Sequence, residues 1–162
     1  NRMMDENGSG SLAAWLFGNR AGSLAHRWAL VPLRLMIGVI FITHGAQKAF
    51  GAFGGGGFGG TVNMLMGLGF PVPEVFAVML ILAELVGGTL LVLGVIPRID
   101  ALALFIVMAV AITTAHWSDG FFGTHMQQVI AAGCVTVFIA GGGALSLQPS
   151  RPRSVEAEGE EE

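Results

Sequence analysis

Three ionisable side chains lie within apolar stretches of this sequence, where charge is costly. His44 and Lys48 stand four residues apart in the segment Leu33–Gly51, and Glu84 lies near the middle of the apolar run Phe76–Leu91. Imidazole, ammonium and carboxylate groups exchange protons and form strong hydrogen bonds. Because ionisable residues inside membrane-spanning segments usually mark functional sites, we interpret these three as candidates for acid–base chemistry.

The composition indicates that a lipid bilayer surrounds these residues. Of the 162 residues, 53% are hydrophobic and 12% are charged, and the mean hydropathy is +0.70. Soluble domains are less apolar, so we expect an integral membrane protein. Several spans of roughly 20 residues leave no room for a separate catalytic domain. No strongly basic segment is present, so no binding of nucleic acid is expected.

Four apolar segments predict an all-α protein, an integral membrane four-helix bundle with short loops. Short connections require neighbouring helices to pack antiparallel. A polar segment at the membrane interface is expected before the bundle, and an acidic disordered tail after it. The predicted bundle occupies residues 29–148, with spans at 29–50, 74–96, 101–117 and 125–147, between an N-terminal segment 1–28 and a tail 149–162.

Glycine and proline predict the connections between the spans. The run Gly51–Gly60 predicts a flexible external loop. Residues 61–69 are too few to cross a bilayer, so a short interfacial or re-entrant helix is expected there. Pro97–Asp100 predicts a tight turn, and Thr124 is expected to cap the fourth span.

Basic residues concentrate at one end of the predicted bundle. Lys48 is alone at the opposite end. The positive-inside rule therefore predicts that both termini are cytoplasmic. The residues on the side of the termini are Arg20, Arg27, Arg34, Arg98, Arg151 and Arg153.

Helical spacing predicts that the first two spans meet along small residues. Glycines let helix backbones approach closely, and the first span carries them on the same stripe as its ionisable residues. We therefore expect Glu84 to lie towards His44, with Lys48 reaching it from above. The glycines of this predicted seam are Gly38, Gly45, Gly87 and Gly88.

The antiparallel path brings further polar residues to the same outer end. His116 ends the third predicted span, and Gln128 and His125 begin the fourth. These positions predict a polar pocket that opens outwards. Arg34 lies at the other end of the first span, where its side chain either extends to lipid headgroups or supports the site electrostatically.

Three interpretations of this polar cluster remain open. A structural network would fix the register of the helices through mutual hydrogen bonds. A quinone or other redox-ligand site would use imidazole and carboxylate to supply hydrogen bonds and protons. A metal site of His44, Glu84 and His116 is chemically feasible, but no close-spaced ligand motif occurs, so no metal is predicted. Cys134 is the only cysteine and is expected to pack as a small apolar residue.

Several motifs in combination resemble the DoxX family of small four-helix membrane proteins of bacteria and archaea. The resemblance covers about residues 30–147. It implies a multi-pass protein of the cytoplasmic (inner) membrane of a prokaryote, similar to the quinone-reducing subunit of thiosulfate:quinone oxidoreductase. The motifs are Arg34 followed by Gly38, then His44–Gly51, Glu84–Gly88, Leu93–Arg98, His116 and Gly141–Ser146.

The resulting hypothesis is a membrane subunit of a redox complex that binds or reduces quinone. Glu84 and His44 are the expected catalytic residues. No motif for haem, flavin or an iron–sulfur cluster is present, so no covalently attached cofactor is expected and a protein partner would supply electrons. The alternative is a non-catalytic scaffold or accessory subunit of a larger membrane complex. The expected quinone-binding residues are Arg34, His44, Lys48, Glu84, His116 and Gln128.

Overall fold

The fold is entirely α-helical in the computed structural model, which describes residues 23–115 and 120–147. Four helices in these ranges are long and apolar enough to cross a membrane, which confirms the predicted all-α bundle. The predicted N-terminal interfacial segment up to residue 22, the end of the third predicted span and the acidic tail lie outside the described residues. The elements are α2 (Ser23–Phe50), the 3-10 helix η1 (Ala52–Gly54), α3 (Gly57–Gly67), α4 (Pro73–Leu93), α5 (Pro97–Thr114) and α6 (Gly120–Ala140).

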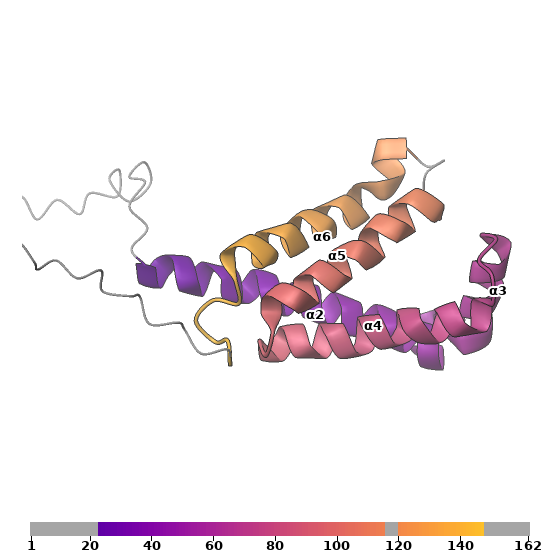
Figure 1. The fold of residues 1–162 in the computed structure, drawn as a ribbon, viewed down its shortest axis with the longest axis horizontal. Coiled ribbons are helices and arrows are strands. Elements are labelled where there is room, and N and C mark those ends of the chain that lie inside the picture. The colour runs from indigo at the N-terminus through magenta and orange to yellow at the C-terminus, as the bar shows by residue number, and fades with distance from the viewer. Residues whose placement is uncertain (1–22, 116–119, 148–162) are drawn as a thin grey trace, which may run out of the picture.

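The four long helices form two pairs. Helix α2 packs along α4, and α5 packs along α6, with a tight connection between α4 and α5. The two pairs lie close together at the end that holds the α4–α5 connection, and they diverge towards the end that holds α3 (Figure 1). The helix bundle therefore has a closed end, at the α4–α5 connection, and an open end, at α3.

The hydrophobic core joins the two pairs. Phe41 of α2, Leu91 of α4 and Leu104 of α5 are almost fully buried in it. Cys134 of α6 is completely buried in the same cluster, so the prediction that it packs as a small apolar residue is confirmed. Gly133 lets α6 approach α2, since an added Cβ atom there would lie 2.7 Å from Ile37.

The seam between α2 and α4 is built from glycines. A Cβ atom added at Gly38 would lie 2.8 Å from the carbonyl oxygen of Gly88, and one added at Gly45 would lie 2.7 Å from Leu85. Three of the four predicted seam residues are therefore confirmed. The prediction for Gly87 is wrong, because this residue faces Leu104 of α5. Adjacent helical residues point about 100° apart, so Gly87 and Gly88 cannot both face α2.

The connection between α4 and α5 is shorter than predicted. Gly94 ends α4 with a left-handed φ of 69° and donates its N–H to the carbonyls of Leu90 and Leu91. Pro97 already begins α5, so the predicted turn over Pro97–Asp100 is wrong. Proline at the first helical position is favoured because its φ is fixed at a helical value and its missing N–H is not needed there.

Helix α6 begins and ends earlier than the span predicted at 125–147. It starts at Gly120, and Thr124 lies inside it, where Oγ1 donates to the carbonyl of Gly120 at 2.9 Å. Thr124 is therefore not a cap. After Ala140 the chain leaves the helix, with a φ of 89° at Gly141.

The glycine-rich stretch is more ordered than predicted. It contains η1, and α3 begins within it at Gly57. Thr61 anchors α3 to the end of α2, because its Oγ1 donates to the carbonyls of Lys48 at 3.2 Å and Gly57 at 3.0 Å. Leu65 of α3 is also buried. Tertiary contacts thus offset the low helix propensity of glycine.

Arg34 holds the closed end together. Its side chain is 1% exposed and donates to the carbonyl of Gly142, to that of Val92 at 3.3 Å and to that of Leu145 at 3.1 Å. We call this group of contacts the arginine clasp. It fastens the segment after α6 to the end of α4, so the interpretation that Arg34 extends to lipid headgroups is wrong. The cytoplasmic position of both termini stays a prediction.

Substitution of Gly88 by alanine should separate α2 from α4. The new Cβ atom would lie 2.8 Å from a backbone oxygen, and overpacking of this kind costs about 1 to 3 kcal/mol. Unfolding titrations with SDS in mixed micelles measure the loss. Gly67→Ala is the control, because a Cβ atom there meets nothing within 4 Å. Equal stability of both variants would contradict close packing at the seam.

Substitution of Arg34 by lysine should weaken the arginine clasp. A single ammonium cannot reproduce the forked donors of a guanidinium, and each hydrogen bond lost from a charged donor costs roughly 1.5 to 3 kcal/mol. The same SDS titration measures the change. Arg98→Lys is the matched control, because Arg98 is exposed and donates only to Ile139 at 3.4 Å in the described structure. Similar losses of stability in both variants would show that the arginine clasp does not stabilise the fold.

Candidate functional site

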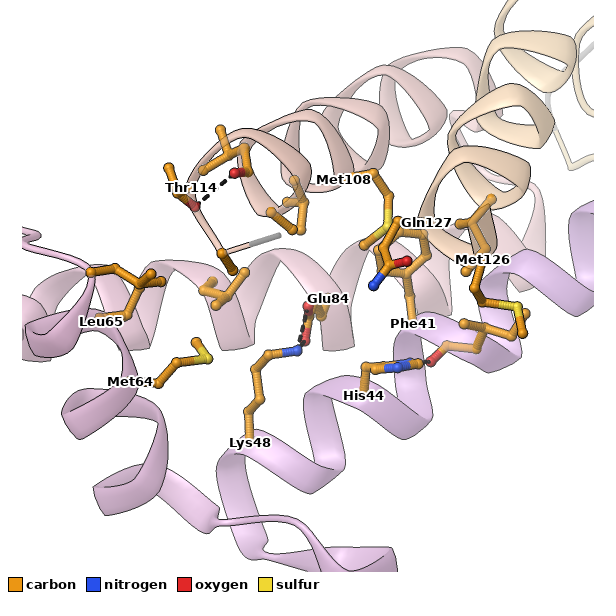
Figure 2. A pocket seen from close by; sticks show the side chains of 18 of the residues that line it. Phe41, His44, Lys48, Met64, Leu65, Glu84, Met108, Thr114, Met126 and Gln127 are labelled. Carbon is orange, nitrogen blue, oxygen red and sulfur yellow. Dashed lines mark hydrogen bonds and ion pairs between the residues drawn. The ribbon is translucent and has the colours of Figure 1, made fainter. Parts of the chain in front are cut away.

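A cavity of about 290 Å³ lies between the two helix pairs at the open end, with α3 along one side (Figure 2). Most of its wall is apolar and includes Phe41, Leu65 and Met108. Its main polar groups come from three different helices. They are His44 and Lys48 of α2, Glu84 of α4 and Gln127 of α6.

Lys48 and Glu84 form an ion pair across the seam between α2 and α4. The Nζ atom of Lys48 lies 2.7 Å from both carboxylate oxygens of Glu84. Glu84 is 2% exposed and Lys48 22% exposed. The predicted approach of Lys48 to Glu84 is therefore confirmed. An ammonium group has three N–H donors, so the pair leaves Lys48 one hydrogen for a further acceptor.

His44 lies one turn before Lys48 on α2 and lines the same cavity. Its Nδ1 atom is 2.8 Å from the carbonyl oxygen of Ile40. Because a carbonyl can only accept, Nδ1 carries the hydrogen of this bond. In the neutral ring the Nε2 atom is then a proton acceptor. His44 is exposed, so the ring is accessible from outside the cavity as well.

Gln127 is a cavity residue that the sequence reasoning missed. It lines the cavity, whereas the predicted Gln128 does not line it and instead donates to Oγ1 of Thr124 at 2.6 Å. No signal in the sequence separates the two glutamines, because the residue seven positions later is apolar in both cases; only burial in the structure distinguishes them. Seven residues after Gln127 stands the buried Cys134, but seven residues after Gln128 stands the exposed Val135.

The other predicted site residues do not join the cavity in the described structure. Arg34 lies at the closed end, in the arginine clasp. His125 is exposed, with Nδ1 against the carbonyl of Phe122, and does not line the cavity. His116 lies outside the described residues. Of the six predicted binding residues, His44, Lys48 and Glu84 therefore come together.

The site offers proton exchange and hydrogen bonding inside a membrane domain. The described ranges contain no group of three His, Cys, Asp or Glu side chains that could hold a metal ion. Glu84 lies near the middle of the Pro73–Leu93 span, where few water molecules are available to screen charge, and Lys48 reaches it from near the end of the Trp28–Phe50 span. Electrostatic interactions with the free N–H of Lys48 are strengthened in such surroundings.

The sequence model of DoxX matches residues 29–117, which is more than half of the chain. The chain belongs to the DoxX family. The match includes the ion pair and His44 but ends before Gln127. This DoxX chain is also 30% identical over 127 residues to the inner membrane protein YphA of Escherichia coli K12, covering 73% of this chain and 86% of YphA. No solved structure matches.

The expected location agrees with these findings. Four helices can cross a membrane, and the related YphA is named as an inner membrane protein. The resemblance seen in the sequence motifs is confirmed as family membership. Catalytic activity and cofactor use stay predictions.

Breaking the ion pair from one side should cost more than replacing both partners. Lys48→Met leaves the carboxylate of Glu84 buried without its cation, at a cost of about 3 to 5 kcal/mol. Lys48→Met combined with Glu84→Gln should recover part of this loss, since no charge then remains unpaired. SDS titration of the two single variants and the double variant gives the coupling energy. Additive losses would contradict a direct interaction.

Proposed function

We propose that this DoxX protein is a membrane subunit of a redox complex and binds a quinone in the cavity. The single observation that carries the proposal is the Lys48–Glu84 pair, which lines an apolar cavity within the membrane domain and leaves one ammonium hydrogen of Lys48 unused by Glu84. A quinone combines a polar ring with an apolar body. It therefore matches both the cavity wall and the donor.

The size and position of the cavity support a small, lipid-soluble molecule. Its volume of about 290 Å³ is just below the range for small-molecule sites, about 300 to 1,000 Å³, so it suits a small ligand. Among its lining residues, His44 and Met126 are exposed on the outer surface of α2 and α6. Because these helices span the membrane, we infer that a ligand enters from the bilayer.

Each polar residue has a role that follows from its contacts. The third N–H of Lys48 donates to a ring oxygen of the ligand and favours negative charge there. Glu84 holds the ammonium in place through both of its oxygens. Nε2 of His44 accepts or returns a proton at the edge of the cavity. A bound quinone itself supplies the redox chemistry, taking up two electrons and two protons to form a hydroquinone.

The electrons must come from another protein. The sequence contains one cysteine and no motif for a haem, a flavin or an iron–sulfur cluster. We therefore propose a partner subunit that carries a redox cofactor. Both termini would lie in the cytoplasm, because Arg34 and Arg98 belong to the closed end of the bundle and Lys48 to the other.

A non-catalytic scaffold is the second candidate. One observation favours it: Lys48 and Glu84 already neutralise each other's charge without any ligand. In that case the pair fixes the register of α2 against α4, and the protein serves as an accessory subunit of a larger membrane complex.

Quinone binding separates the two candidates. We expect wild-type protein in lipid nanodiscs to bind decylubiquinone with one site per chain, measured by isothermal titration calorimetry. Glu84→Gln should lose stability in the SDS titration, as expected for breaking the ion pair from one side, but it should still assemble with its partners. It should weaken binding at least tenfold and impair quinone-coupled turnover, because the amide cannot balance the charge of Lys48. Arg98→Lys is the control. Absence of binding to the wild-type protein would favour the scaffold.

A further inference from the structure

Gln127 stands out among the polar side chains of the cavity because it is incompletely bonded. Its Oε1 atom is buried and has no hydrogen-bond partner among the described residues. A buried acceptor without a partner costs roughly 1 to 3 kcal/mol. Such groups are rare in native proteins and call for an explanation.

The neighbouring polar groups on α6 do not share this property. Thr124 donates to the carbonyl of Gly120 at 2.9 Å, and Gln128 donates to Thr124 at 2.6 Å. Both bonds lie within the helix itself. The unbonded acceptor is therefore specific to Gln127, a residue that lines the cavity, and is not shared by the start of α6 in general.

Gln127 belongs to the opposite helix pair from the ion pair. Lys48 and Glu84 come from α2 and α4, and Gln127 reaches into the cavity from α6 (Figure 2). The cavity wall also includes Phe41 and Met108, which offer no strong hydrogen bond. A molecule in the cavity thus meets an ammonium from one helix pair and an amide from the other, with apolar contacts from the rest of the wall.

We propose that Gln127 is the specificity-determining residue that binds the ligand's second ring oxygen, the one farther from Lys48. The inference rests on the proposed function and narrows its ligand to rings with oxygen atoms on opposite edges. An amide carries both an acceptor and a donor. Oε1 accepts from the hydroxyl of the reduced ring, and Nε2 donates to the carbonyl of the oxidised ring after the amide rotates. Gln127 therefore binds both forms.

The test compares two ligands and two variants under anaerobic conditions. Decylhydroquinone and decylphenol share a ring and tail, but decylphenol lacks one hydroxyl. We expect wild-type protein in nanodiscs to bind decylhydroquinone about tenfold more tightly than decylphenol, measured by calorimetry. Gln127→Met keeps the length of the side chain but should bind both ligands equally. Gln128→Met is the matched control and should retain the wild-type preference.

The outcomes separate this inference from the proposed function. A preference for decylhydroquinone that persists in Gln127→Met overturns the role of Gln127 and leaves quinone binding intact. Failure of the wild-type protein to bind either ligand or decylubiquinone overturns both. SDS titration of the variants guards against misfolding, and Gln127→Asn provides a second, polar variant. Asparagine keeps the amide on a shorter chain, so it should retain part of the preference if the amide makes the contact.

Discussion

The ion pair between Lys48 and Glu84 is the interaction on which the arrangement of this membrane domain depends. Few water molecules reach the interior of a bilayer, so a buried carboxylate needs a cation or a proton. Lys48 meets this need from the neighbouring helix at 2.7 Å. The glycine seam makes the contact possible, because α2 and α4 approach closely enough for a side chain of one helix to reach the middle of the other.

The arginine clasp meets the same requirement at the closed end by different means. Arg34 binds three carbonyl oxygens and no carboxylate in the described structure. Helix α2 is therefore fixed at two points. Lys48 binds it to α4 through the ion pair, and Arg34 binds it to the segment after α6 through backbone carbonyl oxygens. Between these fixed points the α5–α6 pair diverges from the α2–α4 pair, and the cavity lies where they separate. The contacts that fix α2 thus also determine where the cavity forms.

The sequence predicted the parts of the site that depend on regular spacing. His44 and Lys48 are four residues apart, and a carboxylate in the middle of a span needs a partner, so their approach to Glu84 could be inferred. The same periodicity did not separate Gly87 from Gly88 or Gln127 from Gln128, because one residue of register changes the direction of a side chain by about 100°. Choosing between such neighbours requires knowledge of how the partner helix is placed.

Other features had no signal in the sequence. The partners of Arg34 are carbonyl groups, which every residue carries, so nothing in the sequence identifies Gly142 or Leu145 as the residues it binds. The start of α3 at Gly57 depends on Thr61 and the buried Leu65, and these contacts outweigh the local preference of a glycine-rich stretch for a loop. In both cases the conformation depends on tertiary contacts, which the local sequence does not specify.

The arginine clasp also constrains how the chain enters the membrane during synthesis. Arg34 is translated 108 residues before Gly142 and 111 before Leu145. At about 5 to 20 residues per second, this interval lasts roughly 5 to 20 s. During that time α2 carries a guanidinium that lacks two of its three final acceptors, so its charged end must stay hydrated or in contact with the insertion machinery. Biogenesis can therefore finish only after the last span has emerged from the ribosome.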